Sequence, residues 1–337
     1  MGGFISAIPS SIALGLIWGI MAIGVYITFR ILDVADLTVD GTLATGGATL
    51  IFCLMRGQNV YVSMFIAFLA GCIAGLVTGI LHTLLGIPAI LAGILTQLAL
   101  YSVNLRILGG SNLPVSPYSF NLVTNSASIS NFFKSVAEHE WKGGFGQKLG
   151  DISLKLAQPV PSMIVVVVIS ALFVVVTIAL LYWFFGTEVG HAIRATGCNL
   201  NMAKANGINT NNAKIIGLVL SNGLVALSGA LLAQINGFAD VNSGRGAIVI
   251  GLAAVIIGEV LFGKIFKNFA LKLFAVAIGG IIYYVVMQFV INLGLNTDDL
   301  KLLTAVVVAV ALGIPYLRGK YAEKHVRMPK KQEEGNE

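Results

Sequence analysis

The chain has 337 residues, of which 57% are hydrophobic and only 11% are charged, and its mean hydropathy is +0.89. Soluble domains carry about 25% charged residues, so this composition excludes an ordinary soluble protein and indicates a membrane protein. A transmembrane β-barrel is excluded too, because its strands alternate apolar and polar side chains, whereas the apolar stretches here are continuous. The net charge of +6 comes from basic residues at the membrane boundaries, so we expect no nucleic-acid partner.

A helix that crosses a bilayer needs about 20 predominantly apolar residues, or fewer where it begins inside a buried break. On this basis we predict an all-α polytopic membrane protein of about nine transmembrane helices. The nine predicted spans are residues 4–29, 42–55, 60–83, 85–105, 160–185, 213–236, 246–263, 268–293 and 302–317. The first stretch lacks the basic segment and the small-residue cleavage site of a signal peptide, so we expect it to be retained as a helix.

The distribution of Lys and Arg predicts the orientation, because cytoplasmic loops are enriched in both residues. Placing the C-terminus inside puts thirteen of the 21 basic residues on the cytoplasmic side. We therefore expect the N-terminus and the long polar loop 106–159 outside, and the loop 187–212 inside. The outer loop is expected to contain a short surface helix. This loop is either the surface on which a binding protein docks or a solvent-exposed insertion without a binding role.

Two predicted helices are preceded by short polar breaks, at residues 33–41 and 237–246. Both breaks place Asp beside Gly, and such irregular backbone at membrane depth is tolerated only where it is buried in protein or lines a cavity. In the predicted topology one break faces inward and the other outward. This is the arrangement of an inverted repeat whose interrupted, re-entrant helices flank a transport pathway. The alternative is two ordinary polar loops.

Small residues recur at four-residue spacing on two predicted helices, as Gly15 and Gly19 on the first and Gly71, Gly75 and Gly79 on the third. Inside a bilayer the hydrophobic effect does not drive helices together, so they associate through close packing. Small residues allow their backbones to approach each other. The spacing therefore predicts close helix contacts and carries no information about a substrate.

The loop 187–212 is too polar to enter the bilayer, yet it contains helix formers interrupted at Gly197 and closed by Gly207. This pattern predicts a short, exposed helix–turn–helix that can dock into the groove of a partner protein.

The same loop carries a family resemblance. Its segment GHAIRATGCNLNMAKANGI resembles the loop of permease subunits from ATP-binding cassette importers of the branched-chain amino acid and ribose kind. The resemblance continues through SNGLVALSGALLAQINGFADV and GRGAIVIGLAAVIIGEVLFG, and the first break, LDVADLTVDGTLATGGA, is similar to the family's corresponding stretch. It covers about residues 10–315, is weakest over 110–160, and is nearest to a subgroup associated with tryptophan and tyrosine uptake.

The resemblance implies two sets of functional residues. In the family this loop supplies the coupling helix that contacts the ATPase subunit. By position, the residues implied here are Arg194, Ala195, Thr196, Gly197, Asn199 and Ala203. The residues implied to line the translocation path are Thr38, Asp40, Gly41, Asn222, Asp240 and Asn242. For Asn222 an interhelical hydrogen bond is an equally good interpretation.

The sequence contains fragments of catalytic motifs, but each lacks an essential residue. The run Gly258–Ile265 approaches a phosphate-binding loop but ends in Ile where Ser or Thr is needed. His139 and Glu140 begin a zinc-protease motif whose second His is missing, and the three cysteines form no metal-binding cluster. We therefore expect a non-catalytic subunit with no metal and no cofactor of its own, with ATP and Mg bound by the partner ATPase.

The resemblance thus implies a permease domain at 1–317 and a disordered cytoplasmic tail at 318–337, in a bacterial inner membrane. Its partners would be an ATPase subunit, an extracytoplasmic solute-binding protein, a second permease copy as a homodimer, and membrane lipid. The cargo would be a small solute, and the subgroup implies an amino acid of the aromatic kind. The alternative is a self-contained secondary transporter, in which Asp36, Asp40 and Asp240 would carry protons or sodium.

Overall fold

The computed structural model describes residues 2–115, 162–263 and 265–293, together with 302, 304–306, 308–310 and 313. The predicted span 302–317 lies partly outside these residues, and the loop from 116 to 159 and the tail 318–337 lie wholly outside them.

The described part of the chain is almost entirely helical, as the continuous apolar composition predicts. The elements are α1 (Gly2–Tyr26), the π-helical turn η1 (Ile27–Ile31), α2 (Val39–Met55), α3 (Val60–Thr83), α4 (Ala89–Leu108), β1 (Asn112–Pro114), α7 (Ser162–Phe185), α8 (Glu188–Cys198), α9 (Leu200–Ala205), α10 (Thr210–Asn236), β2 (Phe238–Asp240), α11 (Ala247–Phe262) and α12 (Phe269–Asn292).

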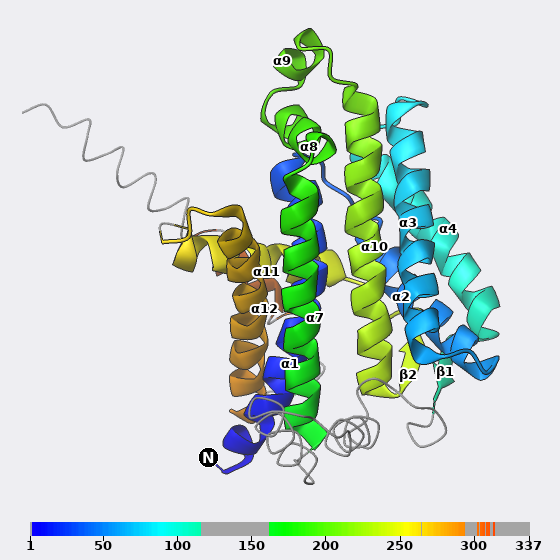
Figure 1. Ribbon diagram of the computed structural model, residues 1–337. Coiled ribbons are helices and arrows are strands. Elements are labelled where there is room, and N and C mark those ends of the chain that lie inside the picture. The colour runs from blue at the N-terminus through cyan, green and yellow to red at the C-terminus, as the bar shows by residue number, and fades with distance from the viewer. Residues whose placement is uncertain are drawn as a thin grey trace, which may run out of the picture.

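Each of the first eight predicted spans corresponds to one of these helices, with ends that differ by a few residues. Within the described residues, six helices are long and apolar enough to cross a membrane, whereas α2 and α11 are shorter. The fold is therefore that of a polytopic all-α membrane protein. The long helices stand side by side, and α8 and α9 lie at the end opposite the N-terminus, where α9 protrudes beyond the bundle (Figure 1).

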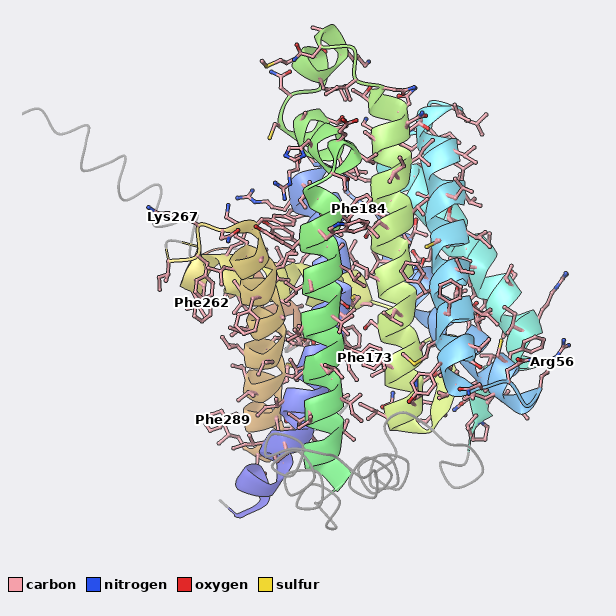
Figure 2. All side chains as sticks on the ribbon, viewed as in Figure 1. Arg56, Phe173, Phe184, Phe262, Lys267 and Phe289 are labelled. Atoms are coloured by element: carbon pink, nitrogen blue, oxygen red, sulfur yellow. The ribbon has the colours of Figure 1, made fainter. Side chains whose placement is uncertain are left out.

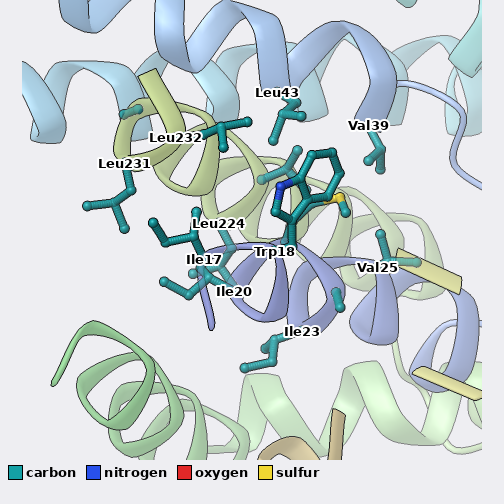
Figure 3. Close-up of a cluster of buried hydrophobic side chains, with 14 of the residues drawn as sticks. Ile17, Trp18, Ile20, Ile23, Val25, Val39, Leu43, Leu224, Leu231 and Leu232 are labelled. Carbon is teal, nitrogen blue, oxygen red and sulfur yellow. The ribbon is translucent and has the colours of Figure 1, made fainter. Parts of the chain in front are cut away.

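Helices α1 and α10 form the centre of the bundle. In their apolar windows 83% and 72% of residues are buried inside the protein, against 22% for α4 and 33% for α7. Ile17 and Ile20 of α1 meet Leu224 of α10 in the hydrophobic core (Figure 3). Since a helix that faces lipid can expose its apolar side chains, the peripheral helices keep much of their apolar surface outside.

Each of the two central helices packs against its own set of neighbouring helices. Helix α1 packs most extensively on α12 and also contacts α11, while α10 packs most extensively on α3 and α2. The predicted close contacts are confirmed at these interfaces. A Cβ on Gly15 or Gly19 would meet the α12 backbone, and a Cβ on Gly71 or Gly75 would meet the α10 backbone. Close packing therefore requires glycine at these positions.

Both predicted breaks are present, but the first is shorter than predicted, because residues 39–41 already belong to α2. Residues 32–38 separate η1 from α2, and residues 237–246 separate α10 from α11. The second break begins with β2, which pairs antiparallel with β1 so that Asn112 lies opposite Asp240. The start of the loop 106–159 is thus attached to the second break, a contact that the sequence analysis did not foresee.

Candidate functional site

The first break is held by a buried carboxylate. Asp36 is 2% exposed, and its Oδ1 accepts a hydrogen bond from the backbone N–H of Thr38 at 2.9 Å. Its Oδ2 accepts one from the amide nitrogen of Asn222 at 2.7 Å. A buried charge is tolerated only when donors surround it. These two contacts fix the chain just before α2 begins.

Asn222 lies near the middle of the 27-residue helix α10 and is fully buried. Besides donating to Asp36, it accepts a hydrogen bond from the hydroxyl of Thr42 at 2.8 Å. Both ends of its amide are therefore used between helices. Because α2 starts beside the midpoint of a membrane-length helix, the first break reaches deep into the bundle.

A chain of hydroxyls joins the same break to two further helices. The Thr38 hydroxyl lies 2.7 Å from that of Thr78 on α3, which donates to Thr96 on α4 at 2.9 Å. All three side chains are buried. Gly41 allows α2 to pack closely on α4, since a Cβ there would lie 3.1 Å from the α4 backbone at Gln97.

Asp40 connects the two breaks. It lies in the first turn of α2, and its carboxylate accepts hydrogen bonds from the backbone N–H groups of Gly246 and Ile248, both at 2.9 Å. These groups begin α11, and the first N–H groups of a helix have no partner within the helix. Asp40 therefore serves as a non-local N-cap. It also brings negative charge to the positive ends of two helix dipoles at once.

Asp240 and Asn242 differ from the other predicted path residues. Asp240 Oδ1 accepts from the backbone N–H of Asn242 at 2.9 Å, within an exposed turn of the second break. Of the six predicted path residues, Thr38, Gly41 and Asn222 are buried, Asp40 and Asp240 are half-buried and Asn242 is exposed. The structure thus gathers Thr38, Asp40, Gly41 and Asn222 around the first break and leaves the other two at one end of the bundle.

The loop 187–212 folds as two short helices, as predicted, but the interruption is at Asn199, and Gly197 lies inside α8. Thr187 and Asn199 cap α8 and α9, accepting bonds from the backbone N–H groups of Gly190 at 3.4 Å and Met202 at 3.0 Å. Ser, Thr, Asp and Asn are favoured at such positions because the side-chain oxygen satisfies an otherwise free N–H group.

The predicted coupling residues fall into two groups. Thr196 and Ala203 are buried, and a Cβ on Gly197 would meet the carbonyl oxygen of Ile31 in η1. These three pack the loop onto the bundle. Asn199 is exposed, whereas Ala195 and Arg194 are half-buried.

The Arg194 guanidinium lies over the ring of Phe269, 4.0 Å from its centroid, and 5.3 Å from that of Phe185.

The sequence analysis missed the side chains that point away from the bundle. Val189, Leu200 and Met202 are apolar yet exposed, with Met202 at 63%. Apolar residues in an otherwise polar loop were the signal that could have identified them. Such exposed apolar groups on a protruding element are typical of a protein interface.

Two cavities lie along α7. One, of about 870 Å³, lies at the α8 end and is bordered by Arg30, Arg194, Lys267 and Lys272. The other, of about 470 Å³, is apolar and is lined by α3, α7 and α10, with Phe173 and Phe184 in the space between α7 and α10 (Figure 2). None of the six predicted path residues borders either cavity. Over the described residues, no group of three or more His, Cys, Asp or Glu could hold a metal ion.

Deep helix breaks that are bonded internally, a lipid-facing periphery and a protruding helical loop define a polytopic membrane transport protein. Residues 8–320 match the family described as the permease component of branched-chain amino acid transport systems. The chain belongs to this family, and it is the permease subunit of an ATP-binding cassette importer. Such a subunit works with an ATPase and a binding protein.

Curated relatives confirm the predicted resemblance. The chain is 38% identical over 312 residues to a tyrosine transport system permease protein of Clostridioides difficile (strain R20291), covering 93% of this chain and 91% of the relative. It is 26% identical over 278 residues to a fructose import permease of Bifidobacterium longum (strain NCC 2705), covering 82% and 68%. It is 26% identical over 243 residues to an autoinducer 2 import permease of Yersinia pseudotuberculosis (serotype O:3, strain YPIII), covering 72% and 58%. No solved structure matches the chain significantly.

Proposed function

We propose that two copies of this chain form the translocation path of a bacterial importer for an amino acid, with an aromatic amino acid as the cargo. The support for the cargo is the tyrosine transport permease, which is similar over nearly its whole length. Relatives named for fructose and autoinducer 2 indicate that related permeases serve unlike solutes. Specificity therefore resides mainly in the extracytoplasmic binding protein that delivers the cargo.

The proposed orientation places α8 and α9 on the cytoplasmic side of the inner membrane, with the N-terminus and the loop 106–159 outside and the tail 318–337 inside. The excess of Lys and Arg on the α8 side supports it. There the exposed side chains of Val189, Leu200 and Met202 enter a groove of the ATPase subunit. That subunit binds ATP and Mg, so this chain is non-catalytic and binds no cofactor.

The bundle is proposed to be an inverted repeat, in which α1, the first break, α2 and α3 correspond to α10, the second break, α11 and α12. The reciprocal packing of α1 on α12 and of α10 on α3 supports this correspondence. In this arrangement α2 and α11 are re-entrant half-helices whose N-termini meet at Asp40. With the segment 302–317 as a further span, the bundle has nine.

A mechanical route joins the docking loop to both breaks. Helix α8 rests on η1 where Gly197 meets Ile31, and η1 leads directly into the first break. The carboxylate of Asp40 then connects this break to the start of α11. Nucleotide-driven closure of the ATPase pair would move α8, and the breaks would shift together to change the opening of the path.

A secondary transporter is the less favoured function. It would use Asp36 and Asp40 as ion or proton carriers, but each carboxylate is already bound by N–H donors of this chain. Asp240 lies in an exposed turn at one end of the bundle. The observation that carries the proposal is therefore the protruding, capped α8–α9 loop with its exposed apolar side chains.

The test is Met202→Glu, with Met55→Glu as a matched control. Met202 is 63% exposed on α9, and Met55 is 58% exposed at the end of α2, on the opposite side of the bundle. A charge in a docking groove should abolish ATPase co-purification for Met202→Glu alone. Equal ATPase recovery with both variants would overturn the docking assignment.

A further inference from the structure

The cavity of about 870 Å³ beside α8 is strongly basic. The cations Arg30, Arg194, Lys267 and Lys272 border it, together with His191, and among the described residues no Asp or Glu does. Glu259 pairs with Arg30 at 2.9 Å and so neutralises one of the four charges. The positive charges of Arg194, Lys267 and Lys272 therefore remain around this one cavity.

Within the described part of the chain, none of these three charges forms an ion pair with a carboxylate. Lys267 and Lys272 are exposed and make no ion pair there, and Lys267 projects beside the end of α12 (Figure 2). Arg194 stacks on Phe269, and its Nε atom is buried without a hydrogen-bond acceptor. A buried, unpaired guanidinium N–H costs free energy, so the site lacks an acceptor.

Apolar and aromatic side chains continue from the cavity onto the membrane-facing surface. Tyr182 and Trp183, at the last turn of α7, border it, and Trp183 is 72% exposed. Leu271 and Phe274 on the adjoining turns of α12 are exposed as well. Trp and Tyr are enriched at the level of lipid headgroups, so the cavity lies where the bilayer surface meets the protein.

From this combination we propose that the cavity binds the phosphate headgroup of an anionic phospholipid. Basic pockets between the cytoplasmic ends of membrane helices bind such headgroups. Lys267 and Lys272 would contact the phosphate, Arg194 would donate its free N–H, and the acyl chains would lie along α7 and α12. A protein partner fits less well, because the cavity lies on the flank of the bundle and not at the protruding tip of α9.

The proposed lipid would also act on the docking loop. Arg194 belongs to α8, while Lys267 and Lys272 belong to the α11–α12 connection and α12. One headgroup would therefore hold α8 against the bundle. This consequence rests on the proposed function, but binding of the lipid does not, because it is measured on the permease without its ATPase.

The experiment is native mass spectrometry of the full chain, purified in mild detergent and titrated with phosphatidylglycerol or phosphatidylcholine. Wild type is expected to retain phosphatidylglycerol selectively. Lys267→Gln with Lys272→Gln should weaken that binding on the order of thirtyfold, which corresponds to about fivefold for each lost charge. The control pair Lys204→Gln with Lys214→Gln removes two charges at the same end of the molecule but outside the cavity, and should bind as wild type does.

Three results would overturn the proposal. Equal phosphatidylglycerol binding by the two double variants would show that the cavity is not the site. Displacement of the lipid by millimolar inorganic phosphate would show a site for soluble anions. Loss of ATPase co-purification in Lys267→Gln/Lys272→Gln, with lipid binding unchanged, would assign the cavity to the partner. If the double variant does not elute as a single species in size-exclusion chromatography, the single variant Lys267→Gln replaces it, because Lys267 lies in a loop. This variant should bind phosphatidylglycerol more weakly than wild type.

Discussion

Removing the Asp40 carboxylate should destabilise the contact between the two breaks. The side chain accepts two backbone N–H groups from the start of α11, each at 2.9 Å. A hydrogen bond to a charged group contributes about 1.5–3 kcal/mol, and Asp40 is only half-buried, so the lower end of that range applies. Asp40→Ala should therefore lower the free energy of unfolding by about 3 kcal/mol. Asp40→Asn, which keeps one acceptor oxygen, should cost about half as much.

The measurement is unfolding of the purified chain in mixed detergent micelles, followed by circular dichroism. Asp240→Ala is the control, because among the described residues the Asp240 carboxylate accepts hydrogen bonds from Asn242 alone, at the other end of the second break. Its loss should cost less than about 1 kcal/mol. If Asp40→Ala and Asp240→Ala unfolded at the same detergent fraction, Asp40 would not join the breaks, and the proposed route from α8 to α11 would fail.

Two further predictions concern helix packing and the buried network. Gly71→Ala should destabilise the chain by about 1–3 kcal/mol, because a Cβ there meets the backbone of α10, whereas Gly110→Ala, with open space around it, should stay within about 0.5 kcal/mol of wild type. Equal free energies of unfolding for Gly71→Ala and Gly110→Ala would contradict the close packing of α3 on α10 at Gly71. Asn222→Ala should cost about 3 kcal/mol, because it removes a donor from the buried Asp36 carboxylate. In a double-mutant cycle, Asp36→Ala should then cost less in the Asn222→Ala background than in wild type, and strict additivity would argue against the contact.

The helices were predictable from composition because a bilayer requires long apolar segments. The glycines on α1 and α3 were also predictable as contact points, since their spacing places them on one face of a helix. The positions of both breaks followed from Asp and Gly in otherwise apolar sequence. These features depend on neighbours along the chain, which a sequence displays directly.

Contacts across the fold were not predictable. Asp40 lies 206 residues from Gly246, and nothing in either segment marks the other as its partner. Asp36 was considered only as an ion carrier in the alternative transporter, yet it proves to be the centre of the hydrogen bonds around the first break. For Asn222, the interhelical hydrogen bond is the role that the structure shows.

In the docking loop, sequence resemblance identified the segment but not the faces of its helices. Thr196 and Ala203 face inward, and Met202 faces outward. A helix of six residues such as α9 is too short to display an apolar periodicity, so only the packing against α8 and α10 determines which side is exposed.

Uptake by reconstituted vesicles tests the central claim, that this permease is driven by a separate ATPase docked on its α8–α9 loop. Vesicles that contain the chain, its ATPase and its binding protein should accumulate tyrosine only when ATP is supplied on the α8 side. Accumulation by the chain alone under a proton or sodium gradient would contradict the account.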